Sequence, residues 1–374
     1  MRFLAFLALC CLSVLAQAQT LPQAPTIAAK SWLLLDYSTG QALASYNPDD
    51  RVEPASLTKL MTAYVVLGAL KEGKLTPTQA VPVSERAWKT PGSRMFIEPK
   101  KPVTVDELLR GMIVQSGNDA CIALAEAVAG SEEAFAQMMN REAQRLGLKA
   151  TRFANATGLS APQHYSTARD LGALAAALIR DFPEHYPLYA LREYTYNRIT
   201  QANRNRLLWL DPAVDGVKTG HTENAGYCLV ASAKRGPRRL LSVVMGAASD
   251  GMRTQESQKL LNFGFQFFDS VKLYGKDQEV SRLRVWKGAQ NTVRAGFLED
   301  FTLSLPKGMA ENLKASLVSQ QPLLAPVLKG QRIATLKLSL DDRPYGEYPV
   351  VALETVPVAG MIGRAWDAMR LWFE

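Results

Sequence analysis

Cysteine is scarce in this chain. It has four cysteines in 374 residues, and two of them, Cys10 and Cys11, fall in an N-terminal apolar run. The other two, Cys121 and Cys228, are too few for a disulfide framework, so a packed core must stabilise the protein. Cys121 and Cys228 either pair with each other or remain two buried thiols.

Histidine and clustered positive charge are also lacking. The three histidines, His164, His185 and His221, include no H-x-x-x-H pair, which argues against a zinc site. The formal net charge is +8, but there is no lysine or arginine run and no basic helix with interleaved aromatic residues. The sequence therefore predicts no metal, no other cofactor and no nucleic-acid partner. Its mild basicity suits a protein near anionic lipid or wall polymer.

The N-terminus has the pattern of a secretory signal peptide. Arg2 precedes an apolar run over residues 3–12, and residues 16–18 form the A-x-A pattern after which signal peptidase cleaves. We expect residues 1–18 to be removed. Leu9 stands before Cys10, where a lipoprotein signal needs a small residue, so lipidation is not expected. The remaining chain of about 355 residues predicts two domains.

The expected elements run from strands to helices and back to strands. A hairpin over residues 31–46 comes first, and the dense apolar run from Ser56 to Leu70 predicts a buried helix between Pro54 and Gly73. Further expected elements are helices at 104–114, 119–128 and 131–147, strands at 227–233 and 240–245, and a helix at about 254–268. This order predicts an α+β or three-layer fold rather than a repeating βαβ arrangement.

The last third of the chain changes character. Residues 270–278 are expected to be a linker, and the alternating stretches of residues 279–354 predict a small β domain without long helices. We therefore divide the mature chain into a catalytic domain at 19–276, a β-rich domain at 277–356 and a terminal segment at 357–374.

The terminal segment predicts an amphipathic helix. Its apolar residues recur at helical spacing opposite four charged ones, and they are Ile362, Ala365, Trp366, Met369, Trp372 and Phe373. A helix this short and charged cannot span a bilayer, but it can lie in the interface with its tryptophans at headgroup depth. The alternative is a C-terminal helix docked on its own domain.

Three short motifs carry the candidate chemistry. They are Ser56-Leu57-Thr58-Lys59, Ser116-Gly117-Asn118 and Lys218-Thr219-Gly220. A second S-x-x-K match at Ser304–Lys307 is set aside because Pro306 and its β-type context deny it a helix. The first motif opens a buried helix, the second separates two helices, and the third sits where a strand should begin. The ordered set is specific where each motif alone is weak.

Together these residues fit nucleophilic catalysis. A serine hydroxyl needs a base to take its proton, and Lys59 lies three residues after Ser56 on the same helix face. Lysine is a base only when desolvation or a neighbouring cation lowers its pKa, and Lys218 can supply that cation. Ser116 can then pass the proton to the leaving amine, while Asn118 holds Lys59 and the substrate amide.

An acyl-transfer site also needs hydrogen-bond donors for the oxyanion. The backbone N–H of Ser56, at a helix start, is one candidate, and the N–H of His221 on the third-motif strand is the other. His221 can also be interpreted as a general base, but its place beside a glycine on a strand edge favours its main chain.

At this point the residues resemble a known family. Ser56-x-x-Lys59, the stretch 116–121 (SGNDAC) and the stretch 215–222 (DGVKTGHT) are similar to those of low-molecular-mass penicillin-binding proteins, the serine-type D-alanyl-D-alanine carboxypeptidases. The resemblance implies a penicilloyl-serine-transferase (β-lactamase-like) catalytic domain, acylation by penicillin and other β-lactams, and release of terminal D-alanine from peptidoglycan stem peptides.

The resemblance also implies roles for individual residues. Ser56 would be the nucleophile, Lys59 the base, Ser116 and Asn118 the proton-relay pair, and Lys218, Thr219, Gly220 and His221 the substrate-binding strand. Arg204 and Arg253 resemble positions near the substrate carboxylate, where a guanidinium is chemically apt. Residues 155–164 resemble the loop over the active site. Location in the periplasm, attached peripherally to the inner membrane surface through the C-terminal helix, follows from the same likeness.

Three other functions remain open from the sequence. A serine β-lactamase shares two motifs, but Gly117 replaces the aspartate of its S-D-N and no E-x-x-L-N segment lies between Ser116 and Lys218, so any such activity would be weak. A D,D-endopeptidase acting on cross-links uses the same chemistry and is not separated by sequence. A noncatalytic wall-binding protein is disfavoured by the intact serine, lysine and asparagine.

Overall fold

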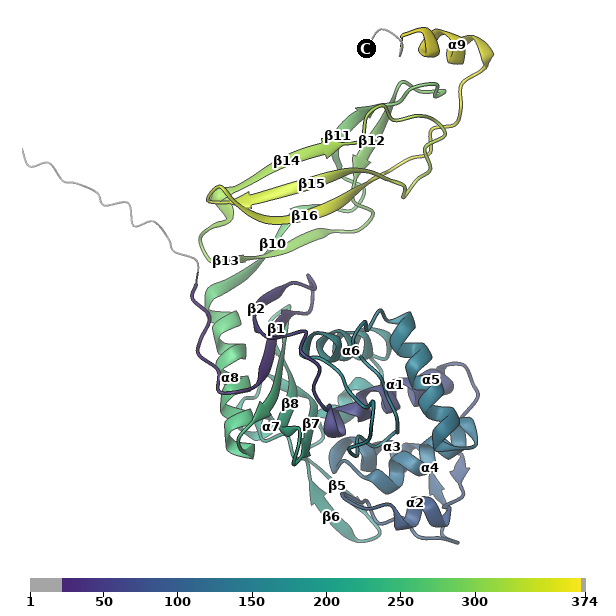
Figure 1. Ribbon diagram of the computed structural model, residues 1–374, viewed down its shortest axis with the longest axis vertical. Helices are drawn as coiled ribbons and strands as arrows, with labels where there is room; N and C mark the ends of the chain where they lie inside the picture. Colours follow the sequence, from purple (N-terminus) through teal and green to yellow (C-terminus); the bar gives the residue numbers. More distant parts are fainter. Residues whose placement is uncertain (1–21, 371–374) are drawn as a thin grey trace, which may run out of the picture.

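The computed structural model describes residues 22–370 (Figure 1). The predicted signal peptide, and Trp372 and Phe373 of the terminal helix, lie outside these residues. Figure 1 shows two parts in an elongated arrangement, with the N-terminal two thirds of the chain forming the larger part and a β-rich part standing on it.

A five-stranded antiparallel sheet forms the centre of the larger part. Its strand order is β2-β1-β9-β8-β7, so the N-terminal hairpin pairs with strands from beyond residue 210. The bounds are β1 Ser31–Asp36, β2 Ala42–Tyr46, β7 Val214–Thr222, β8 Gly226–Arg235 and β9 Arg238–Ala247. The expectation of a sheet built from both chain ends is confirmed.

Helices cover both faces of this sheet. Adjacent residues of a strand point to opposite faces, and accordingly Leu33 joins one buried cluster, with α1, α4 and α6, while Leu34 joins another, with α8. The main helices are α1 Lys59–Lys71, α3 Val105–Val114, α4 Asn118–Ala129, α5 Glu132–Arg145, α6 Ala168–Asp181 and α8 Asp250–Phe267. The result is the three-layer fold that the element order predicts.

Short elements fill the remainder of this part. They are the 3₁₀ turns Ala55–Thr58 and Tyr186–Ala190, the short helices α2 Glu85–Lys89 and α7 Leu207–Leu210, and the paired strands β3 Ala80–Val81 with β4 Val103–Thr104 and β5 Glu193–Tyr196 with β6 Ile199–Ala202. Cys121 and Cys228 are both buried and free, so of the two alternatives for them the pair of thiols is correct.

The smaller part is almost entirely β structure. One sheet has the order β11-β12-β16-β15-β14, and β10 pairs with β13 beside it. The bounds are β10 Phe268–Tyr274, β11 Glu279–Arg284, β12 Thr292–Gly296, β13 Phe301–Pro306, β14 Leu313–Ser319, β15 Arg332–Leu340 and β16 Arg343–Ala352, with one 3₁₀ turn at Ala310–Asn312. Its core is a separate apolar cluster, as expected for an independent β domain.

Two expectations need correction. The segment predicted as a linker is strand β10 over most of its length, because its backbone pairs with that of β13 in an antiparallel ladder. Helix α8 begins at Asp250 rather than near Thr254, because the Ser249 side chain accepts a hydrogen bond from the Met252 N–H and caps the helix there.

The chain ends, as described, in helix α9, Met361–Arg370. Met361, Trp366 and Met369 are 80%, 56% and 51% exposed, and the Asp367 carboxylate accepts a hydrogen bond from the Lys287 N–H at 2.6 Å. Among residues 22–370 no helix is long and apolar enough to cross a membrane. Figure 1 shows α9 beyond the end of the β-rich part that faces away from the larger part.

Candidate active site

The first motif lies on a tight turn that leads into α1. Residues Ala55–Thr58 form a 3₁₀ turn, and only from Lys59 is the helix α-helical. Side chains three residues apart eclipse on a 3₁₀ turn, and the Lys59 Nζ donates to the Ser56 Oγ at 3.0 Å. The predicted pairing of Ser56 and Lys59 is therefore present, on a tighter helix than the α-helix expected.

Lys59 is almost completely buried, and all its partners are neutral. It is 2% exposed, and besides Ser56 it donates to the Asn118 Oδ1 at 2.7 Å and to the Thr157 carbonyl oxygen at 2.6 Å. Burial lowers the pKa of Lys59, and the charge of Arg204 acts in the same direction. A buried lysine held this way can give up its proton and act as a base.

The loop of residues 155–164 fixes the turn from outside. Gly158 has φ +86°, and a Cβ there would lie 1.9 Å from the Ala55 carbonyl oxygen, so only glycine fits this close approach. At the other end of the loop, the His164 Nδ1 accepts from the Ala154 N–H at 2.9 Å, and its Nε2 lies 2.8 Å from the Thr58 Oγ1. Burial lowers the pKa of His164 to about 4, so the ring is neutral and donates to Thr58 through Nε2.

The second motif brings a strained serine to the same place. Ser116 has φ +66°, an unusual conformation for a non-glycine residue that is characteristic of functional sites. Its Oγ is buried and has no hydrogen-bond partner among the described residues. Asn118 is held by its Nδ2, which donates to the Pro91 carbonyl oxygen at 2.7 Å. An unpaired buried hydroxyl beside a lysine and an asparagine is suited to receive or pass a proton.

Asp119, which follows this motif, is structural. Its carboxylate accepts hydrogen bonds from the backbone N–H groups of Met95, Phe96 and Ile97 at 2.9, 2.8 and 3.2 Å. These bonds fix the segment after Gly92 beside the motif, where a Cβ on Gly92 would lie 2.7 Å from the Asn118 Nδ2. No local pattern around Asp119 predicts this role.

The third motif runs through the middle of β7, not at its start as expected. The strand passes very close to the first motif, since a Cβ on Gly220 would lie 3.0 Å from the Pro54 carbonyl oxygen and 3.2 Å from the Ser56 nitrogen. Outside the ladder, the Asn205 Nδ2 donates to the Gly216 carbonyl oxygen at 2.9 Å. The glycine thus lets a strand edge and the start of a helix meet at Ser56.

Lys218 gives the site a second buried ammonium group. It is 3% exposed, and its Nζ donates to the Thr219 carbonyl oxygen at 3.0 Å. Burial lowers its pKa well below the ordinary lysine value, and Lys59, Arg204 and Arg253 lower it further. Within residues 22–370 neither Lys59 nor Lys218 forms an ion pair with an acid. Two such lysines disfavour each other's charge, which favours a neutral base.

The two predicted arginines lie in the same cavity but differ in state. Arg253 is buried, with its Nη1 donating to the Gly220 carbonyl oxygen at 3.0 Å and its Nη2 paired with Asp250. Arg253 therefore holds β7 in place and also lines the cavity. Arg204 has no ion pair among the described residues, and burial together with Arg253 lowers its pKa. Arg204 is therefore the more available cation.

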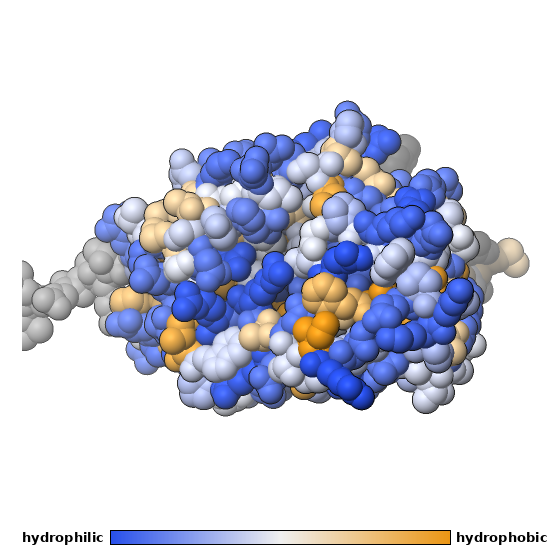
Figure 2. Space-filling view, turned by 90° about the horizontal axis from the view of Figure 1, so that it is seen from below, coloured by the Kyte–Doolittle hydropathy of each residue, from blue (hydrophilic) through white to orange (hydrophobic). Residues whose placement is uncertain are grey.

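A cavity of about 630 Å³ opens onto both serines of the site, while Lys59, Asn118 and Lys218 are not among its lining residues. Its lining includes Ser56, Ser116, Thr219, Gly220, His221, Arg204 and Arg253 from the prediction, and Gly92, Ser93, Arg206, Tyr227 and Asp250 in addition. The His221 ring packs on the Tyr227 ring with 4.1 Å between centroids, which favours a main-chain role for His221. Figure 2, which views this end of the molecule from below, shows a mainly hydrophilic face with scattered apolar side chains.

Sequence reasoning missed the additional lining residues because four of them carry no motif of their own. Arg206 was within reach, since it belongs to the same asparagine- and arginine-rich run as Arg204. Ser93 and Asp250 line the cavity only because loops and helix ends pack together there. No local sequence pattern predicts that packing.

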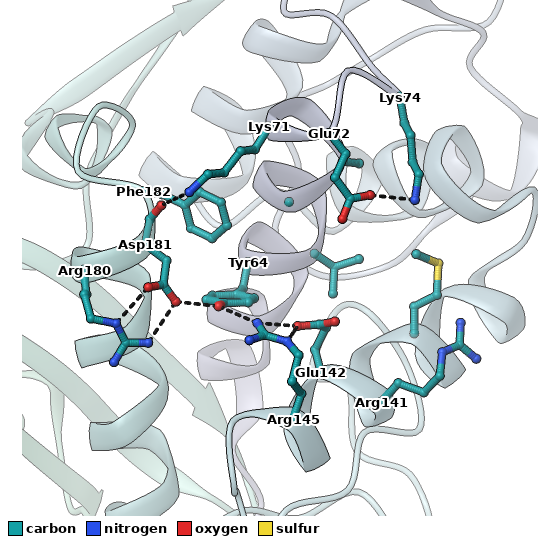
Figure 3. A pocket seen from close by; sticks show the side chains of 14 residues that line it. Tyr64, Lys71, Glu72, Lys74, Arg141, Glu142, Arg145, Arg180, Asp181 and Phe182 are labelled. Atoms are coloured by element: carbon teal, nitrogen blue, oxygen red, sulfur yellow. Dashed lines mark hydrogen bonds and ion pairs between the residues drawn. The ribbon is translucent and has the colours of Figure 1, made fainter. Parts of the chain in front are cut away.

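A second hollow, of about 530 Å³, lies at the opposite end of α1 (Figure 3). Figure 3 shows Tyr64 at its centre, with its hydroxyl between Asp181 and Arg145. Its acids are paired with cations, as in Arg180–Asp181 at 2.8 Å and Lys74–Glu72 at 2.6 Å. None of the described serines, cysteines or histidines lines it, and its Tyr64 hydroxyl is hydrogen-bonded on both sides.

Two family models and several curated proteins match this chain. The family model for D-alanyl-D-alanine carboxypeptidase matches residues 18–249, and that for the C-terminal domain of penicillin-binding protein 5 matches residues 268–358. The D-alanyl-D-alanine carboxypeptidase DacC of Escherichia coli (strain K12) is 46% identical, over 99% of this chain and 94% of that protein.

Solved structures are also similar to this chain. Penicillin-binding protein 5 from Haemophilus influenzae has a TM-score of 0.85 and 42% identity, covering 90% of this chain and 99% of that one. Penicillin-binding protein D2 from Listeria monocytogenes, in its ampicillin-bound form, has a TM-score of 0.58 and 30% identity over 65% of this chain and 100% of that one. The chain belongs to the serine-type D-alanyl-D-alanine carboxypeptidases and is an enzyme of that activity, with a penicilloyl-serine-transferase-like domain followed by an all-β domain.

Proposed function

We propose that Ser56 is the nucleophile of this carboxypeptidase and Lys59 its base. The observation that carries the proposal is the buried Lys59 Nζ, which lies 3.0 Å from the Ser56 Oγ and has only neutral oxygens as partners, so that burial favours its neutral amine form. Ser56 attacks the carbonyl carbon of the penultimate D-alanine while Lys59 takes its proton. The peptide bond then breaks, and water later hydrolyses the acyl-enzyme.

Ser116 and Asn118 complete the proton path in this proposal. The leaving amine needs a proton, and the unpartnered Ser116 hydroxyl can deliver the one that Lys59 received. Asn118 keeps Lys59 in place through its Oδ1. The backbone N–H groups of Ser56 and His221 would bind the oxyanion, which the close approach of Gly220 to the Ser56 nitrogen supports.

We assign the terminal carboxylate of the substrate to the arginine side of the cavity. Arg204 offers a guanidinium without an ion pair among the described residues, and Arg253 and Thr219 lie beside it. Bidentate guanidinium–carboxylate pairing gives both energy and orientation. Lys218 adds to the cationic character of the site, and its charge and that of Lys59 oppose each other. The substrates are peptidoglycan stem peptides ending in two D-alanines.

Acylation by β-lactams follows from the same geometry. A relative of known structure is described in an ampicillin-bound form. In this cavity a β-lactam would present its strained amide to Ser56 and its carboxylate to the arginines. A stable penicilloyl ester on Ser56 is the expected product.

The principal test compares the purified mature protein with its Ser56→Ala variant. Each is incubated with a fluorescent penicillin and with a peptide ending in D-alanyl-D-alanine, and the covalent label and free D-alanine are measured. We expect both in the wild type and neither in the variant. Labelling of the variant would move the nucleophile elsewhere, and absence of D-alanine release from a labelled wild type would contradict the proposed reaction.

We further propose a periplasmic enzyme attached peripherally to the inner membrane. Its domains would be 19–276 and 277–356, and residues 357–374 would be the anchor. Exposed Met361, Trp366 and Met369 on α9 support interfacial binding. Truncation after Val358 should abolish flotation with anionic lipid vesicles and leave D-alanine release intact, whereas flotation of the truncated enzyme would refute the anchor.

A further inference from the structure

One of the oxygens that accept from Lys59 belongs to the loop of residues 155–164. It is the Thr157 carbonyl oxygen, 2.6 Å from the Lys59 Nζ. The preceding residue, Ala156, is fully buried, and its N–H donates to the Glu132 Oε1 at 2.9 Å. Glu132 lies outside the three motifs, as the first residue of α5. It is nevertheless connected to Lys59 through the backbone of Ala156 and Thr157.

Glu132 is a buried carboxylate with both oxygens engaged. It is 9% exposed, and while its Oε1 accepts from the loop, its Oε2 pairs with the Arg86 Nη2 of α2 at 2.5 Å. The ion pair offsets the cost of burying the charge, and the N-terminus of α5 favours an acid at this position. The carboxylate is therefore fixed on one side and holds the loop on the other.

The ion pair with Arg86 does not by itself explain why Glu132 is buried. The Arg86 Nη1 also pairs with Glu133 at 2.9 Å, and the Glu133 side chain is 67% exposed. An acid for Arg86 is thus present without Glu132, at a surface position where an ion pair needs little desolvation. What Glu132 adds, among residues 22–370, is the acceptor for the buried Ala156 N–H.

The carbonyl group of Ala156 is fixed by α1. Thr62 is fully buried, three residues after Lys59, and its Oγ1 donates to the Ala156 carbonyl oxygen at 2.7 Å. Within the loop, the Asn155 Oδ1 accepts from the Gly158 N–H at 2.7 Å. Buried backbone N–H and C=O groups need partners. Removing either partner of Ala156 therefore forces this part of the loop to move.

Close packing does not fix the loop on every side. A pocket of about 360 Å³ borders it, and the lining of that pocket includes Arg86, Glu132, Asn155, Thr157 and Leu159. The Leu159 side chain is 38% exposed. The loop therefore has space into which it can shift, and its hydrogen bonds decide where the Thr157 oxygen lies.

We propose that Glu132 is a positioning residue for the catalytic base. By accepting from the Ala156 N–H, Glu132 fixes the Thr157 carbonyl oxygen. That oxygen in turn keeps the Lys59 Nζ directed at the Ser56 Oγ. The inference rests on the proposed roles of Ser56 and Lys59. Glu132 does not touch the reacting atoms, and the property that matters is its acceptor oxygen rather than its charge.

The test measures acylation of the full mature protein by a fluorescent penicillin. Stopped-flow mixing gives the second-order rate of acylation, and the fraction of protein labelled at completion gives the share that is correctly folded. Glu132→Leu lacks an acceptor and should slow acylation about tenfold or more, because a small misplacement of a catalytic group is this costly. Glu132→Gln keeps an acceptor oxygen and should stay within about threefold of the wild-type rate.

The neighbouring acid provides a matched control. Glu132 and Glu133 both pair with Arg86, but of the two only Glu132 is hydrogen-bonded to the loop. Glu133→Leu should therefore acylate within about twofold of the wild type. Thr62→Val is a second probe, because valine has the shape of threonine but cannot donate to the Ala156 carbonyl. It should slow acylation about fivefold, and it decides the question if Glu132→Leu does not fold.

Three results would overturn the inference alone. The first is a wild-type rate in Glu132→Leu, or in Thr62→Val where it takes its place. The second is a Glu132→Gln or Glu133→Leu variant as slow as Glu132→Leu, which would assign the effect to the ion pairs of Arg86. The third is a smaller labelled fraction with an unchanged rate, which is the sign of a purely structural role. By contrast, a wild type that takes no label, or a Ser56→Ala variant that does, would remove the proposed function itself.

Discussion

The two ends of helix α1 carry similar side chains in opposite electrostatic states. At its start, Lys59 is buried against neutral oxygens and has no acid partner within residues 22–370. At its end, Lys71 is exposed and donates to the Asp181 carbonyl oxygen at 3.2 Å, and nearby acids such as Glu142 and Asp181 have arginine partners at 2.7 and 2.8 Å.

The difference separates a reactive hollow from an inert one of similar size. In the far pocket of Figure 3, paired charges stabilise their ionised forms and cannot take or give protons near neutral pH. In the catalytic cavity, burial without a counter-ion favours neutral lysine, which is unfavourable for stability but useful for catalysis. Size and polarity alone would not have distinguished the two.

The largest expected effect comes from removing the lysine at each end in turn. Lys59→Met should slow penicillin acylation by about 10³-fold, since general bases contribute on that scale, whereas Lys71→Met should leave the rate within twofold. Stopped-flow mixing with a fluorescent penicillin measures both. A Lys59→Met rate within tenfold of the wild type would remove the distinction between the two ends.

The pH dependence sharpens the same contrast. Because burial lowers the pKa of Lys59, its neutral form should appear well below the ordinary lysine value. The acylation rate should therefore rise with pH and level off before that value is reached. A rate that keeps rising to the ordinary lysine pKa would show that the ammonium is not desolvated in solution. Lys71→Met serves as a control and should give the wild-type profile.

Acid should weaken the catalytic end before the far end. His164, hydrogen-bonded to Thr58, has a folded pKa of about 4 against an unfolded value of 6.5. Between these values the unfolded chain binds more protons, so this contribution to stability is lost as pH falls from 6.5 to 4, by about 3 kcal/mol. Urea unfolding at several pH values measures it. His164→Gln should flatten that slope, and an unchanged slope would contradict the assignment.

The smallest effect concerns the far pocket. The Tyr64 hydroxyl donates to Asp181 at 2.6 Å and accepts from Arg145 at 2.7 Å, yet both partners keep other ion pairs. Tyr64→Phe should lower the free energy of unfolding by about 1 kcal/mol and leave acylation unchanged. A large loss of acylation would mean that the two ends are coupled through α1.

The sequence predicted the chemistry of the site better than the contacts that build it. Spacing places Ser56 and Lys59 on one helical face whether the helix is α or 3₁₀, so their pairing is a local property. The contact of Gly158 with Ala55 joins residues a hundred positions apart, and nothing near either residue predicts it. The same holds for Asp119, whose hydrogen bonds go to a segment over twenty residues earlier.

Two predicted element boundaries are wrong. Polar residues at the start of helix α8 give no apolar pattern, and the short strand β10 resembles a connection between domains. The first turn of α8, including Arg253, lacks an apolar stripe, and its signal is the Ser249 cap. Strand β10 alternates Val271 and Leu273 with polar residues, but the alternation is too short to be told from a connection between two domains. Because α8 starts early, Arg253 is a helical residue fixed beneath β7 rather than a loop residue free to move.

The register of the central sheet has a consequence for biosynthesis. Ser31 pairs with Met245 and Leu34 with Ser242, so the sheet closes only when segments more than two hundred residues apart have met. Pairings of such long sequence separation form slowly and late in folding. A chain that stops short of β9 would lack the strand that joins β1 to β8, so β8 and the Lys218 strand would be separated from the rest of the sheet, although the chain holds all three motifs. Acyl transfer by this molecule therefore reports that its synthesis has passed β9.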